Sequence, residues 1–186
     1  MKGRIAKVAL TMTGGLLIAA VPVSSAFASG TAGTATLTGG TLSMNAPTTV
    51  GFGATLNGTA QNVNSPQAID VLDNTGSGTG WNVTLTSTTW TSGGNTLSVT
   101  GTTDSAASGA CDVVSACTLA TNTAITYPVV VPAGSTAPTA IKVQDALVNS
   151  GIAPQTWTHT MVLAIPAAAR SGVYSSTWTY SLVSGP

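Results

Sequence analysis

The strictest constraint on the fold of this chain is an alternation of apolar and polar side chains with a period of two. In residues 81–86, Trp, Val and Leu alternate with Asn and Thr, and residues 156–165 and 174–183 repeat the pattern. Successive side chains of a β-strand point to opposite faces of a sheet, so each segment offers one face to a core and one to water. The pattern predicts antiparallel strands with one solvated side.

Similar segments, separated by Gly, Pro, Asn and Asp, continue along most of the chain. Their threonines and valines are β-branched, which favours strands and disfavours helices. Many short strands with turn signals between them predict an all-β fold, a single domain built as an antiparallel, sandwich-like double sheet. The expected strands are residues 49–56, 67–73, 82–89, 96–101, 124–131, 156–165 and 174–183. The one helical candidate is residues 140–147.

Residues 1–28 have the three-part pattern of a secretory signal peptide. Three basic residues precede an apolar run at residues 8–23, and Ala-Phe-Ala at residues 26–28 offers small residues for cleavage. A membrane anchor is the alternative, but Thr and Gly interrupt the apolar run and no basic flank follows it. The pattern predicts a secreted chain that keeps no membrane span after cleavage.

Residues 29–44 are rich in Gly, Thr and Ala and only weakly patterned. Such a composition is typical of a flexible leader, although an edge strand beginning near Leu37 is also compatible with it. One β domain is expected to follow, over residues 45–186.

Charged residues make up 5% of the chain, against roughly 25% in ordinary soluble domains. After residue 28 the cations are Lys142 and Arg170, and the sequence contains no glutamate. Nucleic-acid binding draws on clustered Lys and Arg, so nucleic acids are not expected as partners. A surface of Thr, Ser, Gly and Ala, hydrated through hydroxyls, is common in extracellular walls and fibres.

Cys111 and Cys117 are the two cysteines of the chain, and they fall within one short polar segment. Export places them in an oxidising compartment, so we predict a disulfide that pins the tip of a hairpin. A zinc site would need further ligands, and His159 is the one histidine. Redox catalysis normally uses a CxxC spacing, which is absent here. No cofactor or metal is expected.

Two motif regions frame the predicted domain. The first is a glycine-rich turn that leads into a strand, with Val71, Asp73, Gly76, Gly78, Gly80, Trp81 and Val83 at its marked positions. The second closes the chain and contains Gly172, Tyr174, Trp178, Tyr180, Leu182 and Pro186. Over residues 36–186 this order resembles the WxL domain of Gram-positive cell-surface proteins. That family carries V-x-D-x-x-G-x-G-x-G-W-x-L, then G-x-Y followed by W-x-L and a terminal proline. Val83 replaces the first leucine and Tyr180 the second tryptophan.

The resemblance implies a noncatalytic, secreted protein that attaches noncovalently to the cell wall through peptidoglycan or another wall glycan, often beside other surface proteins. The residues that it marks as motif or wall-binding positions are Trp81, Val83, Tyr174, Trp178, Tyr180 and Leu182. The residues that it marks as the turn are Asp73, Gly76, Gly78 and Gly80.

The motif aromatics have two possible roles. Trp and Tyr rings stack on the apolar faces of sugars, while Thr, Ser and Asn bond sugar hydroxyls. Aromatic residues on an alternating strand nevertheless normally point inward, so a core role is favoured for Trp81, Tyr174, Trp178 and Tyr180. Trp90, between threonines, is the candidate for an exposed ring.

Asp70, Asp73 and Asn74 precede the glycine turn and are oxygen ligands of the kind that calcium prefers. Their spacing does not match an EF-hand, and Asp and Asn side chains commonly bond the backbone of their own turn. The turn role is the favoured interpretation.

Other polar residues are assigned more ordinary roles. Asp104 and Asp112 flank the cysteine loop and are expected to be solvated. His159 is expected to pack beside Trp157 and Met161 with a hydrogen-bond partner. A catalytic base would need a nucleophile and an orienting acid that the pattern does not locate, so the chain is not expected to be an enzyme.

Two alternatives to wall attachment come from the same residues. A structural surface subunit or adhesin could assemble by adding strands at sheet edges, because few charges guard these strands. A hydrolase of wall glycans is disfavoured, because no glutamate is present and no carboxylate pair has a recognisable context.

Overall fold

The computed structural model describes residues 32–112 and 117–186. The predicted signal peptide lies outside the described residues. The β domain is the unit Leu37–Pro186, and residues 32–36 belong to the preceding unit. In the described part of the domain the one helical element is a 3-10 turn, Asn122–Ala124. The domain is therefore all-β, as the alternation predicts.

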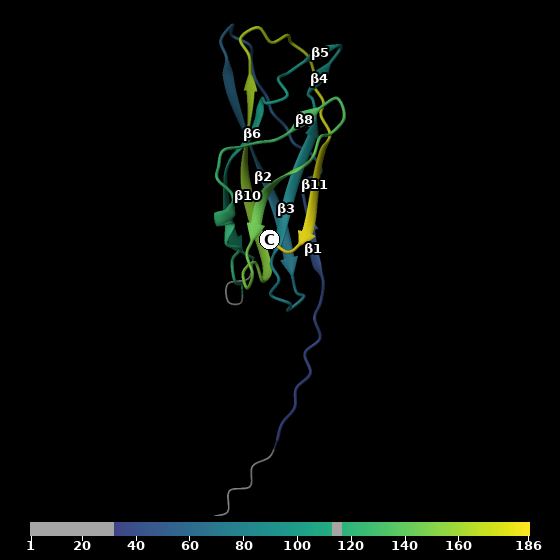
Figure 1. The fold of residues 1–186 in the computed structure, drawn as a ribbon. Coiled ribbons are helices and arrows are strands. Elements are labelled where there is room, and N and C mark those ends of the chain that lie inside the picture. Colours follow the sequence, from purple (N-terminus) through teal and green to yellow (C-terminus); the bar gives the residue numbers. More distant parts are fainter. Residues whose placement is uncertain (1–31, 113–116) are drawn as a thin grey trace, which may run out of the picture. The chain divides into compact units, whose positions relative to one another are not determined.

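The strands form two main sheets that pack as a sandwich-like domain (Figure 1). The first sheet contains, in order, β1 (Leu42–Asn45), β2 (Gln61–Asp73), β10 (Ala153–Ile165), β6 (Thr102–Cys111) and β7 (Val129–Val130). The second contains β11 (Trp178–Ser184), β3 (Trp81–Thr88) and β8 (Ala133–Gly134), with β9 (Ile141–Ala146) also paired to β3. A small hairpin consists of β4 (Thr91–Ser92) and β5 (Asn95–Thr96). All pairings are antiparallel except that of β3 with β8.

Strand β10 is the centre of the first sheet. It pairs with β2 along thirteen residues, from Ala153 opposite Asp73 to Ile165 opposite Gln61, and with β6 on its other side. Its alternation has the expected result, because Trp157 and Met161 are among the side chains buried on its inner face.

The main core lies between the sheets and takes residues from both. The first sheet contributes Ile69, Val71, Trp157 and Met161, and the second contributes Trp81, Val83, Leu85, Val143 and Ala146. Burying one large apolar side chain contributes about 1.5 to 3 kcal/mol. The alternating segments therefore stabilise the fold by facing one another across a shared interior.

The two motif segments are neighbouring strands. β11 pairs with β3 so that Ser184 lies opposite Trp81 and Tyr180 lies opposite Leu85. Tyr180 and Leu182 are partly buried against the main core. The strand that follows the glycine turn and the closing strand are thus neighbours in one sheet.

Several expected elements are wrong. Residues 49–56 form no strand, and the 96–101 segment is mostly irregular, with only its first residue in β5. The expected strand at 124–131 is reduced to β7, and the chain before it includes the 3-10 turn. Strand β6 was missed altogether, because its Ser, Ala and Gly residues carry little β preference.

The helical candidate at residues 140–147 is also wrong, since Ile141–Ala146 is strand β9. Its last four residues are buried and its backbone pairs with β3. Partners far away in the sequence therefore override the local helix preference of this segment. The 29–44 segment divides: residues 32–41 carry no strand, while Leu42 starts the edge strand β1.

Cys111 and Cys117 form a disulfide, as predicted, with their Cα atoms 5.6 Å apart. The bond closes a loop whose residues 113–116 lie outside the described part of the chain. Directly after it, Thr118 bonds the backbone of Ile152. In the chain-entropy picture, a disulfide that closes a loop of this size stabilises the fold by about 2 kcal/mol, because it restricts the unfolded chain.

The glycine turn sets the start of β3. Asp73 accepts hydrogen bonds at Oδ1 from the Thr75 amide and hydroxyl, at 2.9 and 2.7 Å. Gly76, Gly78 and Gly80 then adopt φ values of +66°, +66° and +76°, a region that favours glycine. At Gly80 a Cβ atom would also overlap the Ala146 carbonyl of β9.

We expect Gly80→Ala to lower the free energy of unfolding by about 3 kcal/mol or more, because it combines an unfavourable φ with a clash against β9. Gly76→Ala is the matched control. Gly76 has a similar φ but nothing within 4 Å of the new atom, so it should cost only about 1 kcal/mol. Urea denaturation compares the two, and equal losses would refute the role assigned to the contact with β9.

Candidate functional site

The motif tryptophan is a core residue. The Trp81 side chain is 0% exposed, and its Nε1 donates a hydrogen bond to the Gly151 carbonyl at 2.8 Å. Val83 is equally buried. Neither residue is accessible to a ligand, so any ligand surface of this domain lies elsewhere.

Trp90, the candidate for exposure, is also buried, and that prediction was wrong. Its ring is 7% exposed and packs with Leu97 and Leu163 in a second apolar cluster. Its Nε1 donates to the Thr102 hydroxyl at 3.1 Å. The prediction assumed that a ring between threonines would be exposed. Trp90 lies just past the end of β3, so the alternation of that strand does not determine which way its side chain points.

The second cluster is joined to the main core by aromatic rings. Phe52 lies edge-on to Trp90 with ring centroids 5.7 Å apart, and Trp90 lies 6.3 Å from Trp178. Trp178 in turn lies 6.4 Å from Tyr180. These separations are in the range in which aromatic pairs add about 0.5 to 1.5 kcal/mol beyond area burial. The second motif therefore belongs to a continuous aromatic row.

A hollow of about 460 Å³ opens beside this row. The aromatic residues in its lining are Phe52, Trp90 and Tyr174, and Leu97 and Leu163 are among its aliphatic residues. Its lining also includes Arg170, Ser171 and Gly172. The hollow joins the loop after β1, the end of β10 and the residues that precede β11.

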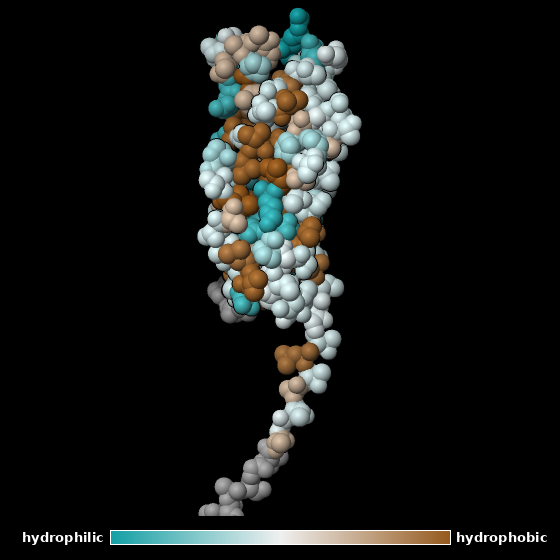
Figure 2. Space-filling view, viewed as in Figure 1, coloured by the Kyte–Doolittle hydropathy of each residue, from teal (hydrophilic) through white to brown (hydrophobic). Residues whose placement is uncertain are grey.

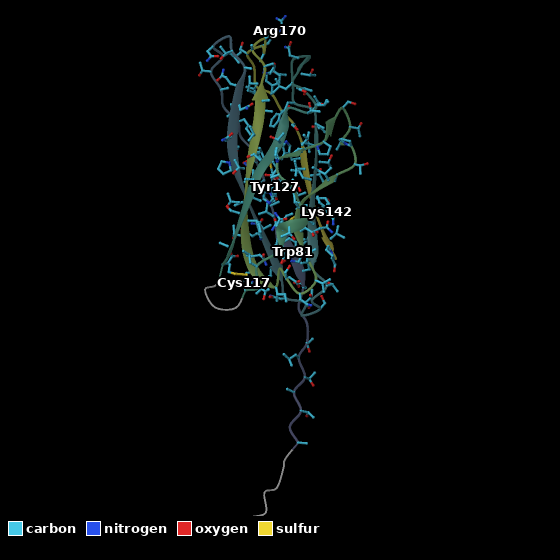
Figure 3. All side chains as sticks on the ribbon, turned by 60° about the vertical axis from the view of Figure 1, so that its left-hand side comes forward. Trp81, Cys117, Tyr127, Lys142 and Arg170 are labelled. Atoms are coloured by element: carbon cyan, nitrogen blue, oxygen red, sulfur yellow. A yellow bond between two sulfur atoms is a disulfide. The ribbon has the colours of Figure 1, made fainter. Side chains whose placement is uncertain are left out.

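Arg170 supplies the charge of the hollow. It lies at the end of the domain opposite Cys117 (Figure 3). Tyr174 donates its hydroxyl to the Arg170 carbonyl at 3.1 Å, which ties the two residues together. Lys142 pairs with Asp145 at 3.3 Å, whereas no carboxylate of residues 32–112 or 117–186 forms an ion pair with Arg170. Arg170 is thus available to a ligand.

The face of the domain shown in Figure 2 carries few strongly hydrophilic residues. Most of it has intermediate hydropathy, interrupted by apolar patches. A ligand that fits such a surface is recognised through hydroxyls and rings, with charge confined to a few points.

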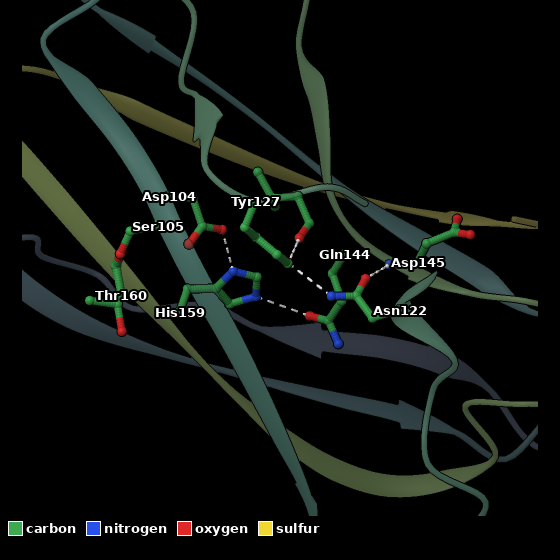
Figure 4. A network of polar contacts seen from close by, with 9 residues as sticks. Asp104, Ser105, Asn122, Tyr127, Gln144, Asp145, His159 and Thr160 are labelled. Carbon is green, nitrogen blue, oxygen red and sulfur yellow. Dashed lines mark hydrogen bonds and ion pairs between the residues drawn. The ribbon is translucent and has the colours of Figure 1, made fainter. Parts of the chain in front are cut away.

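A second group of polar residues lies inside the sandwich (Figure 4). His159 Nδ1 lies 2.6 Å from Asp104 Oδ2, and His159 Nε2 lies 3.2 Å from Gln144 Oε1. All three side chains are fully buried. The expectation that His159 packs in the interior with a polar partner is correct, while the expectation that Asp104 is solvated is wrong.

The Asp104–His159 pair cannot act on an outside substrate, because both side chains are 0% exposed. The neighbouring hydroxyl of Ser105 donates to the Thr160 carbonyl at 2.9 Å and is not directed at the histidine. Burial raises the pKa of Asp104, an effect that the hydrogen bond and charge of His159 oppose. The pair is best understood as a polar tie between β6 and β10.

Gln144 joins this network to β9, and Tyr127 makes a separate set of hydrogen bonds to the same strand. The Tyr127 hydroxyl donates to the Val143 carbonyl at 2.6 Å and accepts from Asn122 Nδ2 at 2.8 Å, and Asn122 Oδ1 accepts from the Asp145 amide. Burial raises the pKa of Tyr127 to about 12, the Asn122 bond lowers it, and the Asp104 charge adds to the rise. Burial followed by the Asp104 charge likewise raises the pKa of Tyr180.

The calcium alternative receives no support from the side-chain arrangement. Asp73 is engaged with Thr75, and Asp70 Oδ1 accepts from the Thr156 hydroxyl at 2.9 Å. Within the described part of the chain, no three His, Cys, Asp or Glu side chains gather closely enough to hold a metal ion.

Two residues of the hollow, Phe52 and Arg170, were not predicted from the sequence as site residues. Phe52 fell in a segment expected to be a strand, and Arg170 was noted only as a cation. A usable signal did exist, since Arg170 is one of two cations after residue 28 and lies four residues before the motif tyrosine, Tyr174.

No family model, no curated protein and no solved structure matches this chain. Across residues 32–112 and 117–186, no helix is long and apolar enough to cross a membrane.

We expect Tyr127→Phe to cost about 1 to 3 kcal/mol at pH 7, because the Val143 carbonyl and Asn122 lose a partner. The folded-state pKa of about 12 exceeds the ordinary value of 10.0. The hydroxyl therefore contributes stability that is complete below about pH 10 and is lost as the pH rises through about 12. The variant should lose less stability over this range than the wild type.

Urea denaturation between pH 7 and the alkaline range measures both effects. Tyr174→Phe is the control, because its hydroxyl bond to Arg170 is exposed and should contribute less. A Tyr127→Phe variant with wild-type stability at pH 7 and an unchanged alkaline slope would contradict the assignment.

Proposed function

We propose that this chain is a noncatalytic, secreted cell-surface protein that attaches to the bacterial cell wall, and that the aromatic hollow is its attachment surface. The ligand is peptidoglycan or another wall glycan. The observation that carries the proposal is the combination of ring-lined apolar walls with one available cation, Arg170, in a domain otherwise poor in charge.

The chemistry of the hollow suits a carbohydrate that bears carboxylates. Aromatic rings such as Tyr174 pack on the apolar faces of sugar rings. Ser171 and the backbone at the rim offer hydrogen bonds to sugar hydroxyls. Arg170 is suited to a carboxylate, which a guanidinium binds through two parallel hydrogen bonds.

The resemblance to WxL domains supports the same function. In this proposal the first motif acts indirectly, because Trp81 is buried and holds β3 in place. The second motif acts both structurally and by direct contact. Trp178 and Tyr180 belong to the aromatic row, and Tyr174 lines the hollow where the ligand would bind. The motif would therefore be a signature of the folded domain that carries the wall-binding surface.

We expect the double variant Arg170→Gln, Tyr174→Ala to bind insoluble peptidoglycan at least about tenfold more weakly than the wild type, because it removes the cation and a stacking ring. Co-sedimentation with purified peptidoglycan measures the bound fraction. Arg170 is exposed and Tyr174 is half-buried, so the fold should survive.

Arg170→Lys and Tyr174→Phe are the matched controls, since they keep the charge and the ring. Both should retain most of the binding. Wild-type pelleting by the double variant would place the attachment surface elsewhere, and failure of the wild type to pellet would exclude peptidoglycan as the ligand.

A second candidate function is that of a structural surface subunit or adhesin that assembles by strand addition. The observation that favours it is that β11 lies at the edge of its sheet and contains neither a charged residue nor a proline. Charges and prolines are the usual features that protect an edge strand from pairing with another chain.

A further inference from the structure

The open edge of β11 presents a defined set of backbone groups. In an antiparallel pair, the residues that bond the partner strand alternate with residues whose N–H and C=O point away from it. The Thr88 amide bonds the Thr177 carbonyl and the Gly185 amide bonds the Gly80 carbonyl, so odd-numbered residues face β3. The backbone groups that point to the open edge therefore belong to Trp178, Tyr180, Leu182 and Ser184.

A groove of about 430 Å³ runs beside the first half of this edge. Its lining consists of residues 47–50, which follow β1, residues 174–178, Tyr180 and Trp90. Every residue that lines the groove is uncharged. The groove therefore offers unpaired backbone, hydroxyls and apolar side chains to an extended segment.

The same chain contains a segment suited to such a groove. Residues 34–38 read Thr-Ala-Thr-Leu-Thr, a period-two pattern with no charge and no proline. They are exposed and belong to no strand of the structure, and Leu37 is 91% exposed. Five extended residues span roughly 17 Å, enough to lie along β11 from Trp178 to Leu182.

We propose that residues 34–38 of one copy of this chain add as a strand to the β11 edge of a second copy. Backbone hydrogen bonds would form with Trp178, Tyr180 and Leu182, and the Leu37 side chain would cover apolar side chains at the open side of the sandwich. This inference rests on the second candidate function and is independent of glycan binding at the hollow.

Side chains suited to receive Leu37 are present there. Strands β1 and β11 are in contact at the edges of their sheets. Leu42 and Met44 from β1, and Tyr180 from β11, are only partly buried against the main core. An added strand would complete the burial of this side, which is how strand addition gains affinity beyond its backbone bonds.

A second copy is a better source of the strand than the same copy. The Gly40 amide donates to the Asn74 carbonyl at 2.7 Å, and the Asn74 amide donates to the Thr41 carbonyl at 3.0 Å. The ladder between β1 and β2 thus continues back to Gly40. For residues 34–38 to reach β11 of their own copy, the chain would have to reverse at Gly39 and Gly40 and disrupt these bonds.

Sedimentation velocity of the secreted chain over a range of concentrations tests the proposal. We expect reversible, concentration-dependent association that persists at about 1 M salt, because no charged residue takes part. Leu37→Asp should raise the dissociation constant about tenfold or more, since it places a charge in an apolar contact. Val148→Asp is the matched control at another exposed apolar residue and should leave association unchanged.

A photoreactive phenylalanine analogue at residue 37 locates the contact. In a mixture of isotopically heavy and light copies, we expect cross-links between copies that map to residues 47–50 or 174–180. A wild type that stays monomeric, equal weakening by Leu37→Asp and Val148→Asp, or cross-links confined to single copies would each overturn the proposal.

Peptidoglycan pelleting of the Leu37→Asp variant separates this proposal from wall attachment. Binding at the hollow predicts that the dissociated variant still binds the wall, so loss of association with retained pelleting supports the strand-addition site. If wild-type association survives in Leu37→Asp, the strand-addition site is overturned whatever the pelleting shows.

Discussion

The structure depends on the burial of one side chain, the Trp81 indole, between the two sheets. Its ring is fully buried, and its N–H is satisfied by the Gly151 carbonyl. A buried indole N–H without a partner would cost about 1 to 3 kcal/mol. Glycine is required on both sides of this site, because a Cβ at Gly151 would press on the indole and one at Gly80 would overlap β9. The glycine turn, β3 and the connection between β9 and β10 therefore meet at one ring.

From this site β3 organises the second sheet, since β11, β8 and β9 all pair with it. The contact between the chain after β3 and the chain before β11 continues beyond both strands through the bridge of Thr91 with Ser175. That continuation brings Tyr174 beside Trp90 at the hollow. Trp81 lies at the start of β3, and the hollow lies beyond the other end of that strand. The paired chain segments that contain β3 and β11 connect the two places.

The apolar faces of β3, β10 and β11 could be predicted from the sequence, because each strand carries its own alternation. The expectation of a solvated opposite face was wrong for β3, since Asn82 and Thr86 are buried there. Strand β6 could not be predicted, because it has no large apolar residue. Strand β10 limits which residues β6 can carry on its inner face. The Trp157 ring of β10 packs so closely on Gly109 of β6 that a side chain at position 109 would overlap the ring. The error at Asp104 follows from the error at β6.

The candidate site was harder to predict than the fold for a physical reason. Local alternation reports which face of a strand is apolar, but it does not report which segments come together in space. The hollow joins Phe52, Trp90 and Arg170 from three separate parts of the chain, and nothing in their local patterns links them. Likewise β9 is a strand because of its pairing with β3, against its local preference.

Hydrogen exchange of the tryptophan indole N–H groups, followed by NMR, tests the central claim most directly. Trp81 is fully buried and hydrogen-bonded at the site on which both sheets depend, so its indole should exchange only through global unfolding. Across destabilised variants, its exchange rate should then rise as the urea-measured free energy of unfolding decreases, because exchange follows the globally unfolded population. Exchange of the Trp81 indole near the rate of an unprotected indole would contradict the account.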